Sequence, residues 1–253
     1  MIRRALIALI LLPFAARAEP VQARYAAYAA GLNVINLDAG FDITPSAYRV
    51  QIVYRTAGTF GFMVRGQQDT TVQGQFVADR AVPQRFYSAG VMRGQQRLTV
   101  IDYAGGQPIV RQLVPPTGNE REPVPAELQR GTIDTLSAMA QLVRQVNETG
   151  RCEGRVTTFD GRRLAELTAR TVGTDSLAPS SMTSFTGNAL HCDFEGRQLG
   201  GFMLDEGREQ LQRPQHGSAW FAAITPGGQK IPVRISFHTR WFGDATMYLV
   251  ERK

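Results

Sequence analysis

The sequence predicts a mainly β protein: a long antiparallel meander curled into an open or half barrel, β-spiral-like, with one amphipathic helix. Most of the chain alternates apolar and polar residues with the period of two that half-buried strands require. Gly, Asp and Pro interrupt this alternation where hairpins must turn. Because twist accumulates from strand to strand, such a long meander is expected to curl rather than stay flat.

The N-terminus, residues 1–18, has the three parts of a cleavable signal peptide. Arg3 and Arg4 give a positive start, Ala5–Ala15 is mainly apolar, and Ala16–Ala18 places small residues at the cleavage positions. The alternative is a membrane anchor, but about 11 apolar residues fall short of the ~20 that cross a bilayer. No Cys follows the cleavage site, as a lipid-anchored lipoprotein would require. We therefore expect a periplasmic protein that does not span the membrane.

The remaining chain, residues 19–253, is predicted to form a single β-rich domain, since 43% hydrophobic residues suffice for one core. Removal of Arg3, Arg4 and Arg17 with the signal peptide lowers the formal net charge from +6 to +3. No run of like charges marks a nucleic-acid-binding face, so no nucleic acid partner is expected.

Cys152 and Cys192 are the only cysteines in the chain. An even pair in an oxidising compartment is most simply a disulfide. The alternative is a redox-active pair, but the chain has no Cys-x-x-Cys spacing that would lower the pKa of a thiol.

The first half reads as a series of strands and hairpins. The clearest strand is 48–54, because Tyr48, Val50 and Ile52 alternate with Arg49, Gln51 and Val53. Further strands are predicted at 60–73, 76–80, 83–89, 97–103 and 108–114, with turns at Gly74, Gly90 and Gly105–Gly106.

One helix is predicted at about 132–148. Its apolar residues, at helical spacing on one face, are Ile133, Leu136, Met139, Ala140, Val143 and Val146. Thr132 or Asp134 can cap its start, and Gly150 can end it. We expect this helix to pack on the sheet as a lid over an apolar cavity that could hold a small amphiphile.

Strands resume after the helix. They are predicted at 155–159, 163–172, around Cys192, and at 231–237 and 245–250, with turns at Asp160–Gly161 and Gly243–Asp244 and a polar loop at 174–187. Pro232 has no backbone N–H to donate to a neighbouring strand. This predicts that its strand either lies at a sheet edge or begins at Pro232.

Residues with catalytic or metal-binding chemistry form no recognisable motif, so we predict no catalytic, cofactor-binding or metal site. His191, His216 and His238 are the only histidines, and no pair has the i, i+4 spacing of a helical zinc site. His191 beside Cys192 suggests a thiol–imidazole pair, but adjacent residues of a strand point to opposite faces. A Gly-x-Ser-x-Gly nucleophile motif and a phosphate-binding loop are both missing from the sequence.

Several short pieces of the chain follow one another in a characteristic order. They are Tyr25–Asp38, Tyr48–Tyr54, Gly58–Gly61, Pro83–Tyr87, Asp134–Ala138, Phe159–Arg163, Cys192, Gly200–Phe202, and a strand pair around Ile231–Phe237 and Tyr248. With the exported leader and the two cysteines, they resemble the periplasmic family catalogued as domain of unknown function 3108. The resemblance covers roughly residues 25 to 250 and implies no activity or catalytic residues.

More distantly, the chain is similar in fold to envelope-integrity proteins with a β-spiral and to periplasmic lipoprotein carriers with a half-barrel and a helical lid. A fold does not fix function. Two hypotheses therefore stand: a non-enzymatic protein that binds a lipid, lipoprotein or other amphiphile in envelope maintenance, or a module that binds envelope proteins or peptidoglycan. An enzyme of unrecognised type is a third.

Overall fold

The structure is a computed structural model that describes residues 20–239 and 243–252. The predicted signal peptide, residues 1–18, lies outside the described residues. The strands are β1 (Val21–Ala29), β2 (Leu32–Ile43), β3 (Ala47–Thr56), β4 (Gly66–Val77), β5 (Arg80–Met92), β6 (Gln95–Ala104), β7 (Gln107–Val114), β8 (Gly154–Phe159), β9 (Leu164–Leu177), β10 (Gly187–Gly200), β11 (Gln215–Ala223), β12 (Lys230–Thr239) and β13 (Gly243–Arg252). The helices are α1 (Gly58–Met63), η1 (Thr117–Asn119), α2 (Ala126–Gln129), α3 (Thr135–Thr149) and α4 (Arg208–Leu211).

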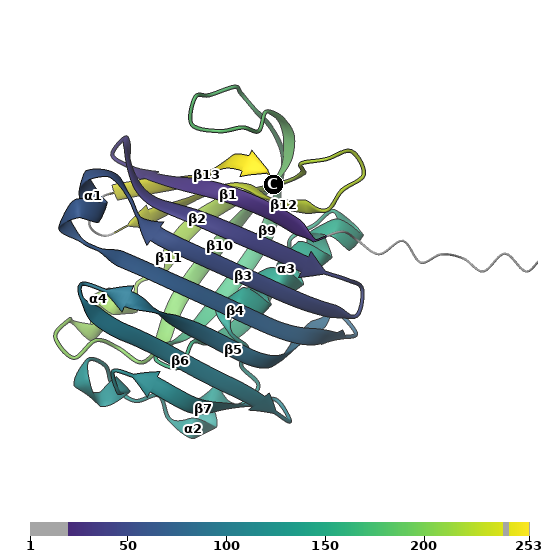
Figure 1. Cartoon of the computed structure of the whole chain (residues 1–253). Coiled ribbons are helices and arrows are strands. Elements are labelled where there is room, and N and C mark those ends of the chain that lie inside the picture. The colour runs from purple at the N-terminus through teal and green to yellow at the C-terminus, as the bar shows by residue number, and fades with distance from the viewer. Residues whose placement is uncertain (1–19, 240–242, 253) are drawn as a thin grey trace, which may run out of the picture.

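All 13 strands belong to one antiparallel sheet in the order β7-β6-β5-β4-β3-β2-β1-β13-β12-β11-β10-β9-β8 (Figure 1). Two meanders, β1–β7 and β8–β13, are joined where β1 pairs with β13. The predicted mainly β fold, an antiparallel meander in an open sheet with one amphipathic helix, is confirmed. The sheet is open because β7 and β8 form its edges and do not pair with each other.

The sheet wraps around α3, which contacts β2, β3, β4 and β5 from one meander and β8 and β12 from the other. In Figure 1, α3 is seen behind the strands of the first meander. The two edges approach each other next to the β8–β9 turn, where Nη2 of Arg162 donates a 2.7 Å hydrogen bond to the carbonyl oxygen of Val114. The sheet is therefore bent into a shell whose concave side faces the helix.

α3 begins three residues later than predicted because Asp134 is its N-cap, accepting a hydrogen bond from the backbone N–H of Ser137. It ends at Gly150, whose φ of 68° is left-handed, as the sequence indicates. The buried face carries Leu136, Ser137, Ala138, Ala140, Val143 and Val146. This face joins the side chains of both meanders in one core. The helix therefore packs into the concave side that it faces, where the sequence predicts a lidded apolar cavity, and a space of about 360 Å³ remains beside Gln141 of the helix.

Two predicted turns are wrong. Gly74 lies inside β4 and Gly90 inside β5. A Cβ atom at Gly74 would lie 2.4 Å from the hydroxyl oxygen of Tyr48 and 2.5 Å from the carbonyl oxygen of Val82. Both glycines therefore lie inside strands where atoms of neighbouring residues leave no room for a side chain. In the sequence, such a glycine cannot be distinguished from a glycine in a turn. The predicted strand 60–73 is also divided, because α1 occupies its first residues.

The strand of Pro232 lies inside the sheet, between β11 and β13, so the sheet edge, one of the two predicted positions, is wrong. The other alternative is close, because β12 begins at Lys230, two residues before Pro232. Pro232 is tolerated because the β11–β12 register shifts beside it, between Trp220 and Phe221. The hydroxyl group of Tyr25, on β1, donates a 2.8 Å hydrogen bond to the carbonyl oxygen of Pro232. Burial raises the pKa of Tyr25, which keeps this donor protonated.

Candidate functional site

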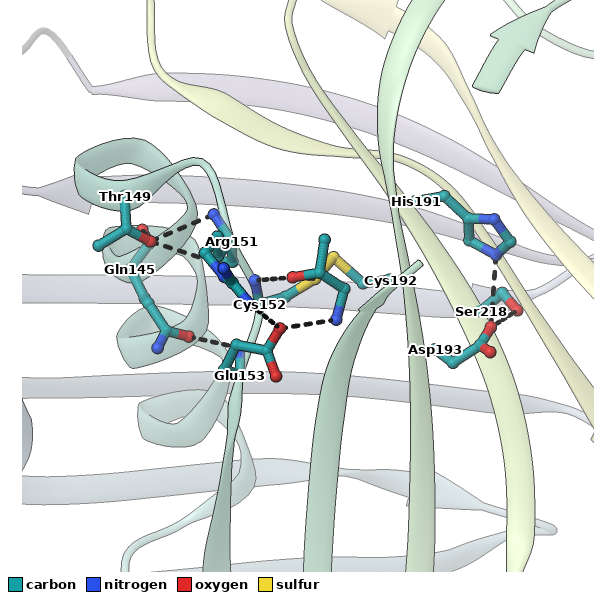
Figure 2. Close-up of a disulfide and its surroundings, with 10 residues drawn as sticks. Gln145, Thr149, Arg151, Cys152, Glu153, His191, Cys192, Asp193 and Ser218 are labelled. Carbon is teal, nitrogen blue, oxygen red and sulfur yellow. Dashed lines mark hydrogen bonds and ion pairs between the residues drawn. A yellow bond between two sulfur atoms is a disulfide. The ribbon is translucent and has the colours of Figure 1, made fainter. Parts of the chain in front are cut away.

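A groove of about 550 Å³ lies on strands β9 to β13. It belongs to the face of the sheet that is turned away from α3. Cys192 points toward α3, where it is bonded to Cys152, and its neighbour His191 points the opposite way, as Figure 2 shows. The lining residues are Thr168, Ala169, Arg170, Asp193, Phe194, Glu195, His216, Gly217, Ser218, Trp220, Ser236, Phe237, His238 and Asp244. We call this cavity the outer groove.

Strand register places the polar side chains of the groove in cross-strand rows. Arg170 is opposite Asp193, Asp193 is opposite Ser218, and Ser218 is opposite Ser236. The guanidinium of Arg170 forms an ion pair with Asp193. The hydroxyl group of Ser218 donates a 2.8 Å hydrogen bond to Oδ1 of Asp193. Because residues of one row share a face, a polar position repeated on four strands produces a continuous polar floor.

The next row forms the wall of the groove and consists of stacked rings. The His191 ring stacks on the Trp220 ring with centroids 4.6 Å apart, and the guanidinium of Arg234 lies 4.6 Å from the Trp220 centroid. His191 and Arg234 are on the strands either side of Trp220, so they cover both faces of the indole. The indole N–H donates a 2.8 Å hydrogen bond to Oδ2 of Asp175. Trp220 is 8% exposed, and this stacking holds it rigidly.

The arrangement of Ser218, Asp193 and His191 differs from that of a hydrolase triad (Figure 2). Oδ1 of Asp193 accepts the hydroxyl of Ser218 and lies 3.3 Å from Nε2 of His191. The carboxylate therefore stands between the serine and the imidazole. A nucleophilic serine needs a base that takes its proton and a third group behind that base. In this order, His191 is not placed to activate Ser218.

All three histidines of the chain lie in or beside the outer groove, each next to a carboxylate. Nδ1 of His191 is 3.0 Å from Asp175, Nδ1 of His216 is 3.6 Å from Glu195, and Nδ1 of His238 is 3.0 Å from Asp244. The sequence gives no sign of this gathering, because the histidines are far apart in the chain and only the register of β10, β11 and β12 brings them together. Sequence reasoning missed the groove for the same reason.

The groove favours a polar ligand that is neutral or positively charged. With histidine counted as uncharged, its lining carries one Arg against the three carboxylates of Asp193, Glu195 and Asp244. Hydroxyl groups of Thr168, Ser218 and Ser236 add donors and acceptors. Phe194 and Phe237 lie in the neighbouring row, next to Asp193 and Ser236 in their strands, so their side chains point to the opposite face of the sheet.

A separate polar cluster lies in the core below α3. The hydroxyl of Tyr48 donates a 2.8 Å hydrogen bond to Oγ of Ser137, which donates a 2.6 Å hydrogen bond to Oδ2 of Asp134. Burial raises the pKa of Asp134 to about 6, and the hydrogen bonds from Ser137 act against this rise. The cluster ties the start of α3 to β3, so we assign it a structural role.

The two predicted site residues, Cys152 and Cys192, are joined in a disulfide with Cα atoms 6.1 Å apart. Cys152 follows α3 directly, and Cys192 lies in the middle of β10, so the bond attaches the end of the helix to the second meander (Figure 2). The backbone N–H of Cys152 also donates a 2.9 Å hydrogen bond to Oγ1 of Thr171. In this disulfide Cys192 has no thiol to pair with His191.

Within residues 20–239 and 243–252, no group of three or more His, Cys, Asp or Glu side chains is placed to hold a metal ion. In the same part of the chain, no helix has the length and apolar character needed to cross a membrane.

Comparisons with known proteins give a family and a fold. The model of the family described as "Protein of unknown function (DUF3108)" matches residues 24–250. No curated protein matches the chain. A crystal structure from Brucella abortus, a "beta-barrel-like protein of domain of unknown function DUF1849", is similar with a TM-score of 0.54 and 14% identity, over 94% of this chain and 98% of that one. At this identity the likeness concerns the fold alone.

Proposed function

Since the chain belongs to the DUF3108 family of proteins of unknown function, we propose its function from its own geometry: it is a non-enzymatic periplasmic protein of the cell envelope that binds a glycan, with peptidoglycan fragments as the ligand class. The outer groove carries this proposal. Its volume of about 550 Å³ lies within the range of about 300–1,000 Å³ typical of small-ligand sites.

The chemistry of the lining supports a glycan. Sugar rings present hydroxyl groups at their edges and C–H groups on their faces. Carboxylates and serine hydroxyls of the groove floor can form hydrogen bonds with the hydroxyl groups of a sugar. The excess of carboxylates over Arg170 suits a ligand that bears free amino groups, as the peptide stems of peptidoglycan do.

The sequence suggested an amphiphile bound in the concave side of the sheet. We propose instead a polar ligand on the outer face, because the apolar residues of α3 pack into the concave side. It keeps the non-enzymatic assignment, which the order of Ser218, Asp193 and His191 supports. The periplasm is the compartment that residues 1–18 predict, and it is where a peptidoglycan ligand would be met.

Titration of the mature protein with soluble peptidoglycan fragments by calorimetry tests the proposal. We expect saturable binding that Glu195→Gln weakens by about tenfold, through loss of a carboxylate of the groove. Glu127→Gln, on α2 and outside the groove, is the matched control and should leave binding unchanged.

Absence of binding at millimolar fragment concentration would overturn the proposal. Equal affinity of the Glu195→Gln and Glu127→Gln variants would place the ligand outside the outer groove and overturn the proposal as well. Circular dichroism of each variant shows whether the fold is retained.

A further inference from the structure

Exposed apolar side chains are concentrated around α1, far from the outer groove in sequence. Phe62 and Met63 end α1 and are 82% and 74% exposed, the highest values among the large hydrophobic side chains of the described residues. Leu32, at the start of β2, is 58% exposed. The N–H of Ala57 donates a 2.9 Å hydrogen bond to the carbonyl of Val34, which sets the start of α1 beside β2.

Three exposed arginines accompany these apolar side chains. Arg55 precedes α1 and Arg65 follows it. The backbone N–H of Arg93 donates a 3.0 Å hydrogen bond to the carbonyl of Arg65, which brings the β5–β6 turn alongside. None of the three side chains forms an ion pair with another described residue.

Acidic residues are missing from α1 and from the β1–β2 and β5–β6 hairpin ends beside it, whereas Asp244 stands at the start of the neighbouring strand β13. Residues 29–37, 53–68 and 86–101 contain no Asp or Glu. Asp205, Glu206 and Glu209 lie in or next to α4, which is separate from α1 (Figure 1). The positive charge of the three arginines is therefore local to α1. We call Leu32, Phe62, Met63, Arg55, Arg65 and Arg93 together the α1 surface.

We propose that the α1 surface binds the surface of an anionic lipid bilayer, with Phe62 and Met63 inserted between headgroups and the arginines in contact with lipid phosphates. Two adjacent apolar side chains that project from a six-residue helix form a small tip rather than a groove. A bilayer accepts such a tip, whereas a stable protein partner needs a broad complementary surface. Unpaired arginines beside the tip match the charge of anionic headgroups.

The consequence is a protein with two separate binding surfaces. The α1 surface would hold it at a membrane, while the outer groove, which lies on β9 to β13, would remain open to the periplasm. The two proposals rest on different residues, so each can fail without the other.

Co-sedimentation of the mature protein with vesicles tests the α1 surface. We expect binding to vesicles that contain phosphatidylglycerol and little binding to pure phosphatidylcholine. Phe62→Ser with Met63→Ser should weaken the binding by about tenfold or more. Replacement of Arg55, Arg65 and Arg93 by Gln should weaken it by about fivefold for each arginine.

Matched controls lie at the other end of β4 and at the start of β5. Val77→Ser removes an apolar side chain that is 61% exposed, and Arg80→Gln removes an exposed charge. Both should leave vesicle binding unchanged. Phe62→Trp adds a direct reading, because brominated lipids should quench its fluorescence when it is inserted.

Equal binding to the two kinds of vesicle, or none to either, would overturn the proposal. So would loss of binding in the control variants equal to that in the α1 variants, or a Phe62→Trp side chain that brominated lipids leave unquenched.

Discussion

Gly201 lies directly against the backbone of Arg162: a Cβ atom at Gly201 would stand 1.8 Å from the carbonyl oxygen of Arg162. Gly201 follows β10, and Arg162 is in the β8–β9 turn. Arg162 also donates to the carbonyl of Val114, and Nη1 of Arg121 donates a 2.9 Å hydrogen bond to the carbonyl of Gly201. These contacts join the two ends of the open sheet without a strand pair between them.

Gly201→Ala is therefore expected to destabilise the protein by more than the cost of placing an alanine at a left-handed φ. Gly201 and Gly227 share a φ of 69°, but a Cβ atom at Gly227 would meet nothing within 4 Å. Gly227→Ala should cost about 1 kcal/mol of unfolding free energy, for the left-handed backbone. Gly201→Ala should cost roughly 2–4 kcal/mol, because the overpacking adds to that strain. Urea denaturation of both variants measures the difference, and equal losses would show that the contact with Arg162 is unimportant.

Both cysteines are predicted to be oxidised in protein that is isolated without a reductant. A thiol assay on denatured, unreduced protein should find no free thiol, and two reactive thiols would refute the disulfide. The loop spans 40 residues, so replacement of Cys152 and Cys192 by Ala should lower the unfolding free energy by about 3.5 to 4 kcal/mol in the chain-entropy model. The reduced wild-type protein provides the control, since it should lose a similar amount.

Asp134 should make stability depend on pH. Burial raises the pKa of Asp134 in the folded protein to about 6, above the ordinary value of 3.8 for an aspartate. Because the folded state binds the Asp134 proton more tightly than the unfolded state does, protonation of Asp134 stabilises the fold. This stabilisation is complete below about pH 4 and is lost as the pH rises through 6. The difference in unfolding free energy between the wild type and Asp134→Asn should therefore be greater at pH 4 than at pH 7. It should change by about 3 kcal/mol.

Urea titrations of both proteins at several pH values between 4 and 8 measure this difference. Asn keeps an oxygen that can accept from the backbone N–H of Ser137, so the helix cap is preserved in the variant. A difference that stays constant with pH would contradict the prediction.

Much of the fold could be predicted because strands and helices leave local periodic patterns. The strand around Tyr48 and Val50, the helix that ends at Gly150 and the turn at Asp160–Gly161 follow from nearest neighbours in the sequence. The glycines mislead for the opposite reason. Gly74 and Gly90 are required by atoms of other strands, and a sequence read locally assigns them to turns.

The outer groove could not be predicted, because it depends on register. His191, His216 and His238 lie on three different strands. A shift of one residue in any strand pair would send a histidine to the other face. The sequence contains the alternation that puts each histidine on a face, but it does not state which residues of β10, β11 and β12 stand opposite one another.

The sequence by itself determined the mainly β class, the single amphipathic helix and the end of that helix at Gly150, because these depend on interactions between residues close together in the chain. Tertiary structure alone decided that Pro232 lies inside the sheet, that α3 packs its apolar face into the concave side and that the polar rows of β9 to β13 form a groove. Those outcomes come from pairing and packing between distant segments, and hydrophobic periodicity carries no information about which segments meet.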